Sequence, residues 1–361
     1  MSKLQQLADS GQSVWYDYIQ RSLLSSERFN SLIEHGLRGV TSNPTIFMKA
    51  ISGSSDYDDA MYQLDESAEN YERYEALVLE DIANAADLFR PVFEATNGLD
   101  GYVSIEVSPK LAYDSKGTVE EAIRLFNQLK RPNIMIKVPA TEEGIPAVSE
   151  LIGLGINVNV TLIFGIEQYL KVANAYIEGL ETFQARKGDL RKVASVASFF
   201  VSRVDTLVDQ HLAEKGNTEL QGKIAIANSK VAYHEAKRLY TEPRWKKLET
   251  NGARVQRLLW ASTGTKNPAY SDTLYVDELI GRNTVNTMPP ATLDAFLDHG
   301  TVQVTLDRDV DEARQQLAQL KYLGLDLQQI TQTLEADGVR QFEESFEALL
   351  GAIDQKQVVV K

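Results

Sequence analysis

The sequence predicts an α/β fold, a TIM (β/α)8 barrel with additional helices. Eight short runs of β-branched and apolar residues alternate with longer helical patterns along the chain. None of these runs is followed by a GxGxxG or GxxxxGKS/T loop, and residues with reactive side chains stand near the ends of nearly all eight. A doubly wound open sheet, the alternative, gathers its ligands at one switch point, so the dispersed pattern favours the barrel.

Each predicted strand is a short run of β-branched or apolar residues, which is typical of strands. The eight runs cover residues 13–19, 39–44, 101–107, 133–139, 157–164, 192–201, 257–263 and 283–289. The longer segments between them carry the helical patterns expected for the outer layer of a barrel.

Two stretches lie outside this alternation. A long helical insertion is expected at about 45–100, where residues 71–98 have the pattern of an acidic amphipathic helix that ends at Asn97-Gly98. Further helices are expected at about 307–355, and the last of them could fold back across the barrel mouth. No linker-like or repetitive tract interrupts the chain, so residues 1–361 are predicted to form one barrel domain.

Composition narrows the function. The chain has no cysteine and only four histidines without ligand spacing, so no metal site is expected. No apolar run approaches the roughly 20 residues of a membrane span, and the N-terminus lacks a targeting pattern, which predicts a cytoplasmic protein without a membrane partner. A net charge of −14 argues against nucleic acid as a partner. An anionic substrate would therefore need a local cationic site.

Lys137 lies within the apolar run NIMIKVPA (133–140), followed by a turn and a helix. Burial of an unpaired ammonium is costly, which favours the free amine that a Schiff-base enzyme uses as its nucleophile. The alternative is a lysine at the mouth of a strand that reaches water or pairs with a carboxylate.

Other polar residues interrupt or follow the predicted strands, and a barrel brings such positions to one pocket. These residues are Asp17, Asn43, Glu106, Asn159, Thr161, Ser198 and Arg203. Singly, each has a structural alternative: Asp17 and Asn43 could cap helices, and Glu106 could be an ion-pair partner of Lys137. Together, two carboxylates, a lysine and several amides and hydroxyls would fill a core poorly but suit carbonyl chemistry.

Two segments, GVTSNPTIF (39–47) and IMIKVPATEEGIPAV (134–148), resemble the signature segments of transaldolases, the second of which holds the imine-forming lysine. NVNVTLIF (157–164) and SVASFFVSRVD (195–205) are similar to the fifth- and sixth-strand segments of that family. The resemblance runs from about residue 10 to 290, and the long second connection resembles the longer-chain bacterial and plant branch.

The resemblance implies a role for each of these positions. Lys137 would be the Schiff-base nucleophile, Asp17 the acid/base for carbon–carbon cleavage, and Glu106 and Thr161 the holders of a catalytic water. The resemblance further implies that hydroxyls of the dihydroxyacetone unit are bound by Asn43, Asn159 and Ser198. Arg203 would bind the sugar phosphate.

The seventh-strand segment, WASTGTKNP (260–268), departs from the family pattern, in which a serine is followed closely by an arginine for phosphate. Ser262 matches the serine, and Lys266 is the displaced cation. A lysine supplies a point charge without the bidentate fork of an arginine. We therefore expect Arg203, Ser262 and Lys266 to form the phosphate site.

The resemblance implies a transaldolase of the pentose phosphate pathway. It would move a dihydroxyacetone unit from sedoheptulose 7-phosphate or fructose 6-phosphate to an aldose phosphate. No cofactor is expected, because the imine itself is the electron sink. The alternatives are a fructose 6-phosphate aldolase that releases dihydroxyacetone, and a catalytically silent barrel that acts as a binding partner.

Overall fold

The computed structural model describes residues 1–65 and 67–360 and contains a closed barrel of eight parallel strands in the order of the sequence. The strands are β1 (Gln12–Tyr16), β2 (Leu37–Val40), β3 (Tyr102–Glu106), β4 (Ile134–Pro139), β5 (Val158–Ile163), β6 (Ser195–Phe200), β7 (Arg257–Ala261) and β8 (Thr284–Met288). Because β1 pairs with both β2 and β8, the sheet has no edge. The predicted TIM (β/α)8 barrel is confirmed.

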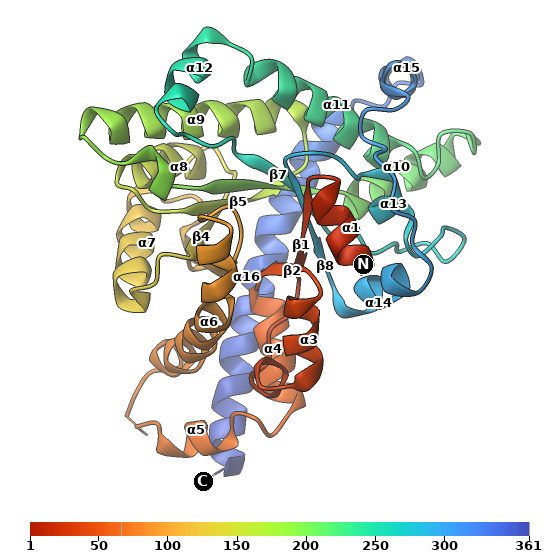
Figure 1. Cartoon of the computed structure of the whole chain (residues 1–361). Coiled ribbons are helices and arrows are strands. Elements are labelled where there is room, and N and C mark those ends of the chain that lie inside the picture. The colour runs from red at the N-terminus through yellow and green to blue at the C-terminus, as the bar shows by residue number, and fades with distance from the viewer. Residues whose placement is uncertain (66, 361) are drawn as a thin grey trace.

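Helices surround this barrel, as Figure 1 shows. Those outside the long insertion and the C-terminal helix are α1 (Lys3–Asp9), α2 (Arg21–Leu24), α3 (Glu27–Glu34), α7 (Ser115–Leu129), α8 (Gly144–Gly153), α9 (Ile166–Ala185), α10 (Ser202–Glu214), α11 (Ile224–Leu239), α12 (Pro243–Thr250), α13 (Leu274–Glu278), α14 (Pro290–His299) and α15 (Val310–Tyr322). Two 3-10 turns, η1 (Pro109–Leu111) and η2 (Leu190–Lys192), complete the connections. The strands and the inner faces of these helices form the main hydrophobic core.

The connection between β2 and β3 holds three helices, α4 (Pro44–Gly53), α5 (Asp58–Gln63) and α6 (Asn70–Ala95), where the sequence pattern indicates one. The side chain of Asn43 accepts a hydrogen bond from the Ile46 amide at 3.0 Å, and Pro44 stands at the first helical position. Both features favour a helix start, so α4 begins directly at the barrel end.

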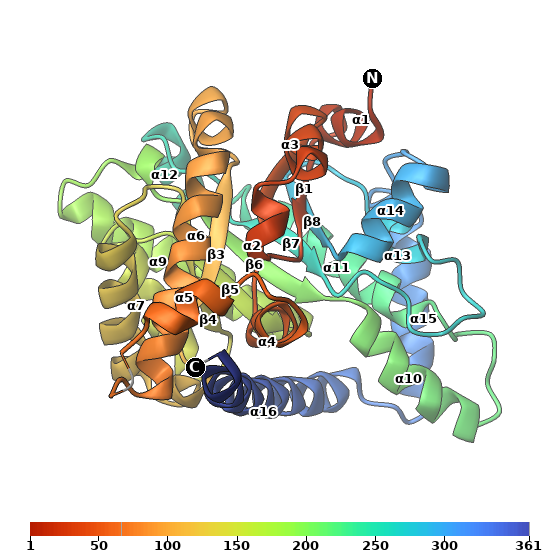
Figure 2. The same cartoon turned by 90° about the horizontal axis from the view of Figure 1, so that it is seen from below.

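Helix α16 (Leu327–Val360) crosses one end of the barrel. It runs through the centre of Figure 1 behind the strands, and Figure 2 shows it as a separate layer at the end opposite α1. Contacts with residues that follow the strands, such as Thr331 against Gly165, identify this end as the one where the strands terminate. Catalytic residues of barrel enzymes lie at this end.

The other end of the barrel is filled by a buried ion pair. Arg257, the first residue of β7, lies 2.9 Å from Asp100, and both side chains are no more than 7% exposed. Ser13 donates a hydrogen bond to Asp100 at 2.7 Å and accepts one from Arg257 at 2.8 Å. These three groups satisfy one another in a dry environment, as buried charges must.

Among the described residues, no helix is long and apolar enough to cross a membrane.

Candidate active site

The barrel brings three of the predicted site residues to one level. Glu106 pairs in register with Lys137, and Lys137 pairs with Asn159, so three neighbouring strands present these side chains side by side. Thr161 lies two residues further along β5, level with Pro139. Side chains two apart on a strand point to the same face, so Thr161 stands above Asn159, nearer the mouth.

Lys137 is almost completely buried, with 7% of its side chain exposed. Its amine donates a hydrogen bond to the Ser42 carbonyl at 3.1 Å and lies 3.8 Å from Glu106 Oε2. The second distance is an ion pair but too long for a hydrogen bond. Lys137 therefore does not reach water along its stem, but it does pair with a carboxylate, as one of the structural alternatives expected.

Glu106 and Thr161 each keep a buried polar atom without a hydrogen-bond partner. Among the described residues nothing bonds to Glu106 Oε2 or to Thr161 Oγ1. Buried polar atoms are normally satisfied, so two such atoms beside a buried lysine mark a place for a polar reactant. Burial raises the pKa of Glu106 to about 7, with Asp17 adding to this and Lys137 opposing it. A carboxyl in this range can exchange a proton near neutral pH.

Asp17 follows β1 directly, and its carboxylate accepts a hydrogen bond from the Thr41 hydroxyl at 2.7 Å. Thr41 is in turn 2.5 Å from the Thr287 hydroxyl on β8. Burial raises the pKa of Asp17, and the Thr41 hydrogen bond with the charges of Lys137 and Lys266 only partly offsets this effect. A carboxyl that interacts electrostatically with both lysines lies inside the same pocket.

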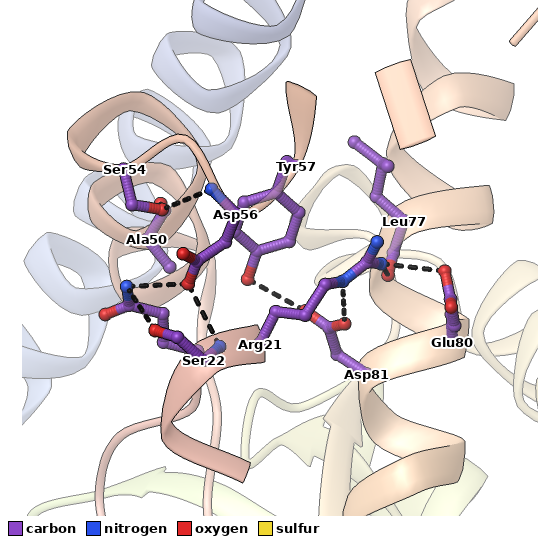
Figure 3. Close-up of polar contacts among 10 residues, drawn as sticks. Arg21, Ser22, Ala50, Ser54, Asp56, Tyr57, Leu77, Glu80 and Asp81 are labelled. Carbon is purple, nitrogen blue, oxygen red and sulfur yellow. Dashed lines mark hydrogen bonds and ion pairs between the residues drawn. The ribbon is translucent and has the colours of Figure 1, made fainter. Parts of the chain in front are cut away.

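Helix α2, which follows Asp17 along the chain, is bonded to the insertion, as Figure 3 shows for Arg21 and Ser22. Arg21 donates to Asp81 of α6 at 2.9 Å, and Asp81 also accepts from Tyr57 at 2.8 Å. The next residue of α2 is bonded as well: the Ser22 amide donates to Asp56, between α4 and α5, at 3.0 Å. The helices between β2 and β3 therefore hold the residues that follow Asp17 in a single arrangement.

A series of hydrogen bonds between polar side chains crosses the barrel interior. Ser198 donates to the Asn159 amide oxygen at 2.7 Å, and the Asn159 amide nitrogen donates to the Ser104 hydroxyl at 3.0 Å. The Ser104 carbonyl accepts from Ser42 at 2.8 Å. Since the Ser42 carbonyl accepts the hydrogen bond of Lys137, this series of hydrogen bonds fixes the position of the amine as well as that of Asn159.

Asn43 has the capping role that was one of its two sequence interpretations. Its amide oxygen is occupied by the Ile46 amide, which leaves the amide nitrogen as the group free to donate. The cap also orients the side chain at the barrel mouth, because α4 starts where β2 ends.

The expected phosphate residues follow β6 and β7. Arg203 lies in the first turn of α10 with its guanidinium over the Phe200 ring at 5.4 Å. Burial lowers the pKa of Arg203, and no carboxylate among the described residues offsets it. Ser262 lies 2.9 Å from Ser202, the neighbour of Arg203, and has a positive φ of 56°. Lys266 is exposed, in agreement with a surface position, although its charge reaches Asp17.

Sequence reasoning missed four polar groups of this site: Ser42, Thr41, Ser104 and Thr287. The first two lie inside the segment GVTSNPTIF, so that segment held the available signal. Ser104 and Thr287 are small hydroxyl residues within strands, which is an ordinary strand composition and gives no signal. No group of three or more His, Cys, Asp or Glu side chains placed to hold a metal occurs in the described part of the chain.

Comparison with known proteins agrees with this geometry. The model of the Transaldolase/Fructose-6-phosphate aldolase family matches residues 14–353. The chain belongs to this family. Among its relatives, the transaldolase of Thiobacillus denitrificans is 50% identical over 348 residues, covering 95% of this chain and 97% of the relative. The transaldolase of Trichodesmium erythraeum is 46% identical over 368 residues, with coverage of 98% and 97%. That of Neisseria gonorrhoeae is 46% identical over 354 residues, with coverage of 98% and 100%.

The family resemblance identified from four sequence segments is therefore confirmed over nearly the whole length of the chain. As a member of the transaldolase/fructose-6-phosphate aldolase family, the chain is related to enzymes that handle sugar phosphates through a lysine Schiff base. Lys137 is a nearly buried lysine that faces both an unpartnered carboxyl oxygen and Asp17.

Proposed function

We propose that this chain is a transaldolase of the pentose phosphate pathway that forms its Schiff base on Lys137. The buried amine, 3.8 Å from Glu106 and without a closer anionic partner in the described part of the chain, is the observation that carries the proposal. The names of its relatives support transfer of a three-carbon unit over simple aldol cleavage.

The reaction begins when Lys137 passes a proton to Glu106 and its amine adds to the ketone carbon of the donor. Water leaves as the imine forms, and Glu106 donates the proton for the departing hydroxyl. Its pKa of about 7 suits this exchange in either direction. Thr161 and Glu106 hold the water that later hydrolyses the imine, using the two polar atoms that have no partner among the described residues.

Asp17 is the base for carbon–carbon cleavage. It removes the proton from the hydroxyl next to the scissile bond, the aldose phosphate leaves, and an enamine of dihydroxyacetone stays on Lys137. The enamine carbon then attacks the aldehyde of the acceptor, and Asp17 returns its proton to the new hydroxyl. Thr41 keeps the Asp17 carboxylate in one orientation through both steps.

Substrate binding follows from the same arrangement. Asn43, Asn159 and Ser198 bind the hydroxyls of the dihydroxyacetone unit. The phosphate of the donor, sedoheptulose 7-phosphate or fructose 6-phosphate, is bound by Arg203, Ser262 and Lys266. An unpaired guanidinium is the local cationic group that a protein of net charge −14 needs for an anionic substrate.

We also propose the cytoplasm as the place of the reaction. Sugar phosphates are anions that do not cross a lipid bilayer unaided, so the enzyme must share the compartment in which they are made.

Trapping with borohydride tests the proposal. Reduction in the presence of fructose 6-phosphate should attach a three-carbon unit to Lys137, located by peptide mapping, and Lys137→Arg should give neither label nor turnover. Asp17→Ala should keep imine formation but lose about 10²–10⁴ in the rate of cleavage. Labelling at a different lysine would overturn the assignment.

A transfer assay separates the two activities named for the family. With fructose 6-phosphate and a four-carbon aldose phosphate, we expect a seven-carbon ketose phosphate as the main product. Release of dihydroxyacetone at the same rate with and without acceptor would instead identify an aldolase.

A further inference from the structure

Helix α16 places an aromatic ring directly over the reactive lysine. The Phe342 ring centroid lies 5.7 Å from the Lys137 amine, and the Phe342 residue is only 7% exposed. The two residues are more than 200 positions apart in the sequence. Hydrocarbon therefore covers the Lys137 amine from the side of the barrel mouth.

This aromatic cover is held on both sides along α16. On the side towards the start of the helix, Gln168 donates to Glu335 at 2.8 Å, and a Cβ on Gly338 would come within 2.9 Å of the Leu162 side chain. On the other side, Thr45 of α4 donates to Ser345 at 2.9 Å. Phe342 lies between these contacts, so its ring position is set by the fold.

The next turn of α16 extends the apolar cover. Phe346 packs edge-on against Tyr74 of α6 with ring centroids 5.2 Å apart. Burial raises the pKa of the Tyr74 phenol, and the charge of nearby Glu106 adds to this effect. Aromatic groups thus line the α16 side of the site, and the unpartnered oxygens of Glu106 and Thr161 offer polar contacts within it.

The cationic groups proposed for phosphate follow different strands. Arg203 and Lys266 come after β6 and β7, whereas Phe342 and Gly338 of α16 lie against Lys137 of β4 and Leu162 of β5, and α16 also packs against α10. An aldose phosphate anchored at Arg203 would therefore approach Lys137 from the side of β6 and β7.

We propose that Phe342 shields the three-carbon unit on Lys137 from water and so favours its transfer over its release. This inference rests on the proposed transaldolase function. In transfer, the enamine carbon forms a bond to the acceptor aldehyde, whose oxygen takes the proton from Asp17. In release, the same carbon takes a proton, water adds to the imine carbon, and the carbon–nitrogen bond breaks to give dihydroxyacetone and free amine. The transfer route then also ends in hydrolysis of an imine, that of the new ketose, by the water that Glu106 and Thr161 hold. A ring that keeps other water from the enamine carbon slows the protonation of that carbon, which only the release route requires.

The ratio of release to transfer measures this role. With fructose 6-phosphate as donor and erythrose 4-phosphate as acceptor, dihydroxyacetone and sedoheptulose 7-phosphate are quantified in the same reaction. Phe342→Ala should raise the ratio by several-fold to roughly tenfold, the size expected for the loss of a close ring contact with the reacting group. Phe342→Leu, which keeps an apolar side chain over the amine, should stay nearer to the unmodified protein.

Ile353→Ala is the matched control, since Ile353 is a fully buried residue of α16 about three turns further along. It removes core contacts of the same helix without touching Lys137, so the ratio should stay unchanged even if thermal stability falls. A parallel fall of both products in Phe342→Ala, with the ratio unaltered, would show that the ring only supports the fold.

Failure of this inference can be told apart from failure of the proposed function. If borohydride labels Lys137 in the unmodified protein and the ratio does not respond to Phe342→Ala, the shielding role is wrong and the Schiff base stands. If Lys137 is not labelled, the proposed function itself is wrong.

Discussion

Arg203 offers a sharp test because its substitution should weaken activity without weakening the fold. Its guanidinium is half-buried, and no carboxylate in the described part of the chain pairs with it. Arg203→Met keeps an unbranched apolar stem over Phe200 and removes only the charged head. Burying an unpaired charge lowers the stability of the protein without ligand. We therefore infer that the Arg203 charge is kept because it binds a ligand.

The expected loss of activity follows from one charge-assisted hydrogen bond. Such a bond contributes about 1.5–3 kcal/mol, and each 1.4 kcal/mol is a factor of ten. The kcat/KM for fructose 6-phosphate should thus fall by roughly 10- to 150-fold, mostly through KM. The kcat/KM of Arg203→Lys should lie between that of Arg203→Met and that of the unmodified protein, since lysine keeps the charge without the planar fork.

The effect on stability should have the opposite sign or be absent. The contact between the guanidinium and the Phe200 ring, at 5.4 Å, contributes about 0.5–1 kcal/mol. Relief of the buried, unpaired charge offsets that loss. Urea unfolding of Arg203→Met should therefore give a free energy of unfolding no lower than that of the unmodified protein.

Two assays check both sides of this prediction. Steady-state kinetics with fructose 6-phosphate and with unphosphorylated fructose separate phosphate binding from chemistry, and the penalty should nearly vanish for fructose. An equal loss on the two donors, or a clear fall in the free energy of unfolding, would refute the reasoning.

Three further predictions concern single groups. The test variant Glu106→Gln removes a carboxyl whose pKa is about 7 in the folded protein against an ordinary pKa of 4.5. Between these pH values the Glu106 carboxyl is protonated in the folded state and ionised in the unfolded chain. As the pH rises from 5 to 8, the free energy of unfolding of the unmodified protein should therefore fall relative to that of Glu106→Gln, by on the order of 1–3 kcal/mol in urea unfolding. A difference that stays constant with pH would contradict this expectation. For Lys266→Ala, only about a two- to fivefold rise in KM for phosphorylated donors is expected, because the charge that is removed is exposed. Salt screens exposed charges, so this rise should be smaller at about 0.5 M salt than in a buffer of about 10 mM. For Asp100→Ala, Arg257 is left buried without its partner, so unfolding should become easier by about 3–5 kcal/mol with kcat almost unchanged. A large loss of kcat in the folded variant would contradict this last expectation.

The fold and most of the candidate site could be predicted because the ends of the eight strands lie next to one another in a barrel. Glu106, Lys137 and Asn159 lie far apart in the sequence, yet their pairing register follows once eight strands are recognised. The roles assigned to these residues stay predictions until the variants are measured.

Phe342 could not be predicted in this way. An apolar residue on an amphipathic helix has the same pattern whether it faces a hydrophobic core or a reactive amine. Its position depends on where α16 crosses the barrel, which is set by tertiary contacts such as the one between Thr45 and Ser345. Likewise, the exposure of Lys266 depends on the path of the loop after β7, for which the sequence holds no periodic signal.

The crossing of α16 also has a kinetic consequence for folding. The hydrogen bond from Thr45 to Ser345 of α16 spans 300 residues, more than the 272 between Gln12 and Thr284, which pair where β1 closes the barrel on β8. Contacts of such long range form slowly, since the chain entropy of a large loop must be lost first. During refolding from urea, catalytic activity should therefore return later than the far-ultraviolet circular dichroism signal of the helices.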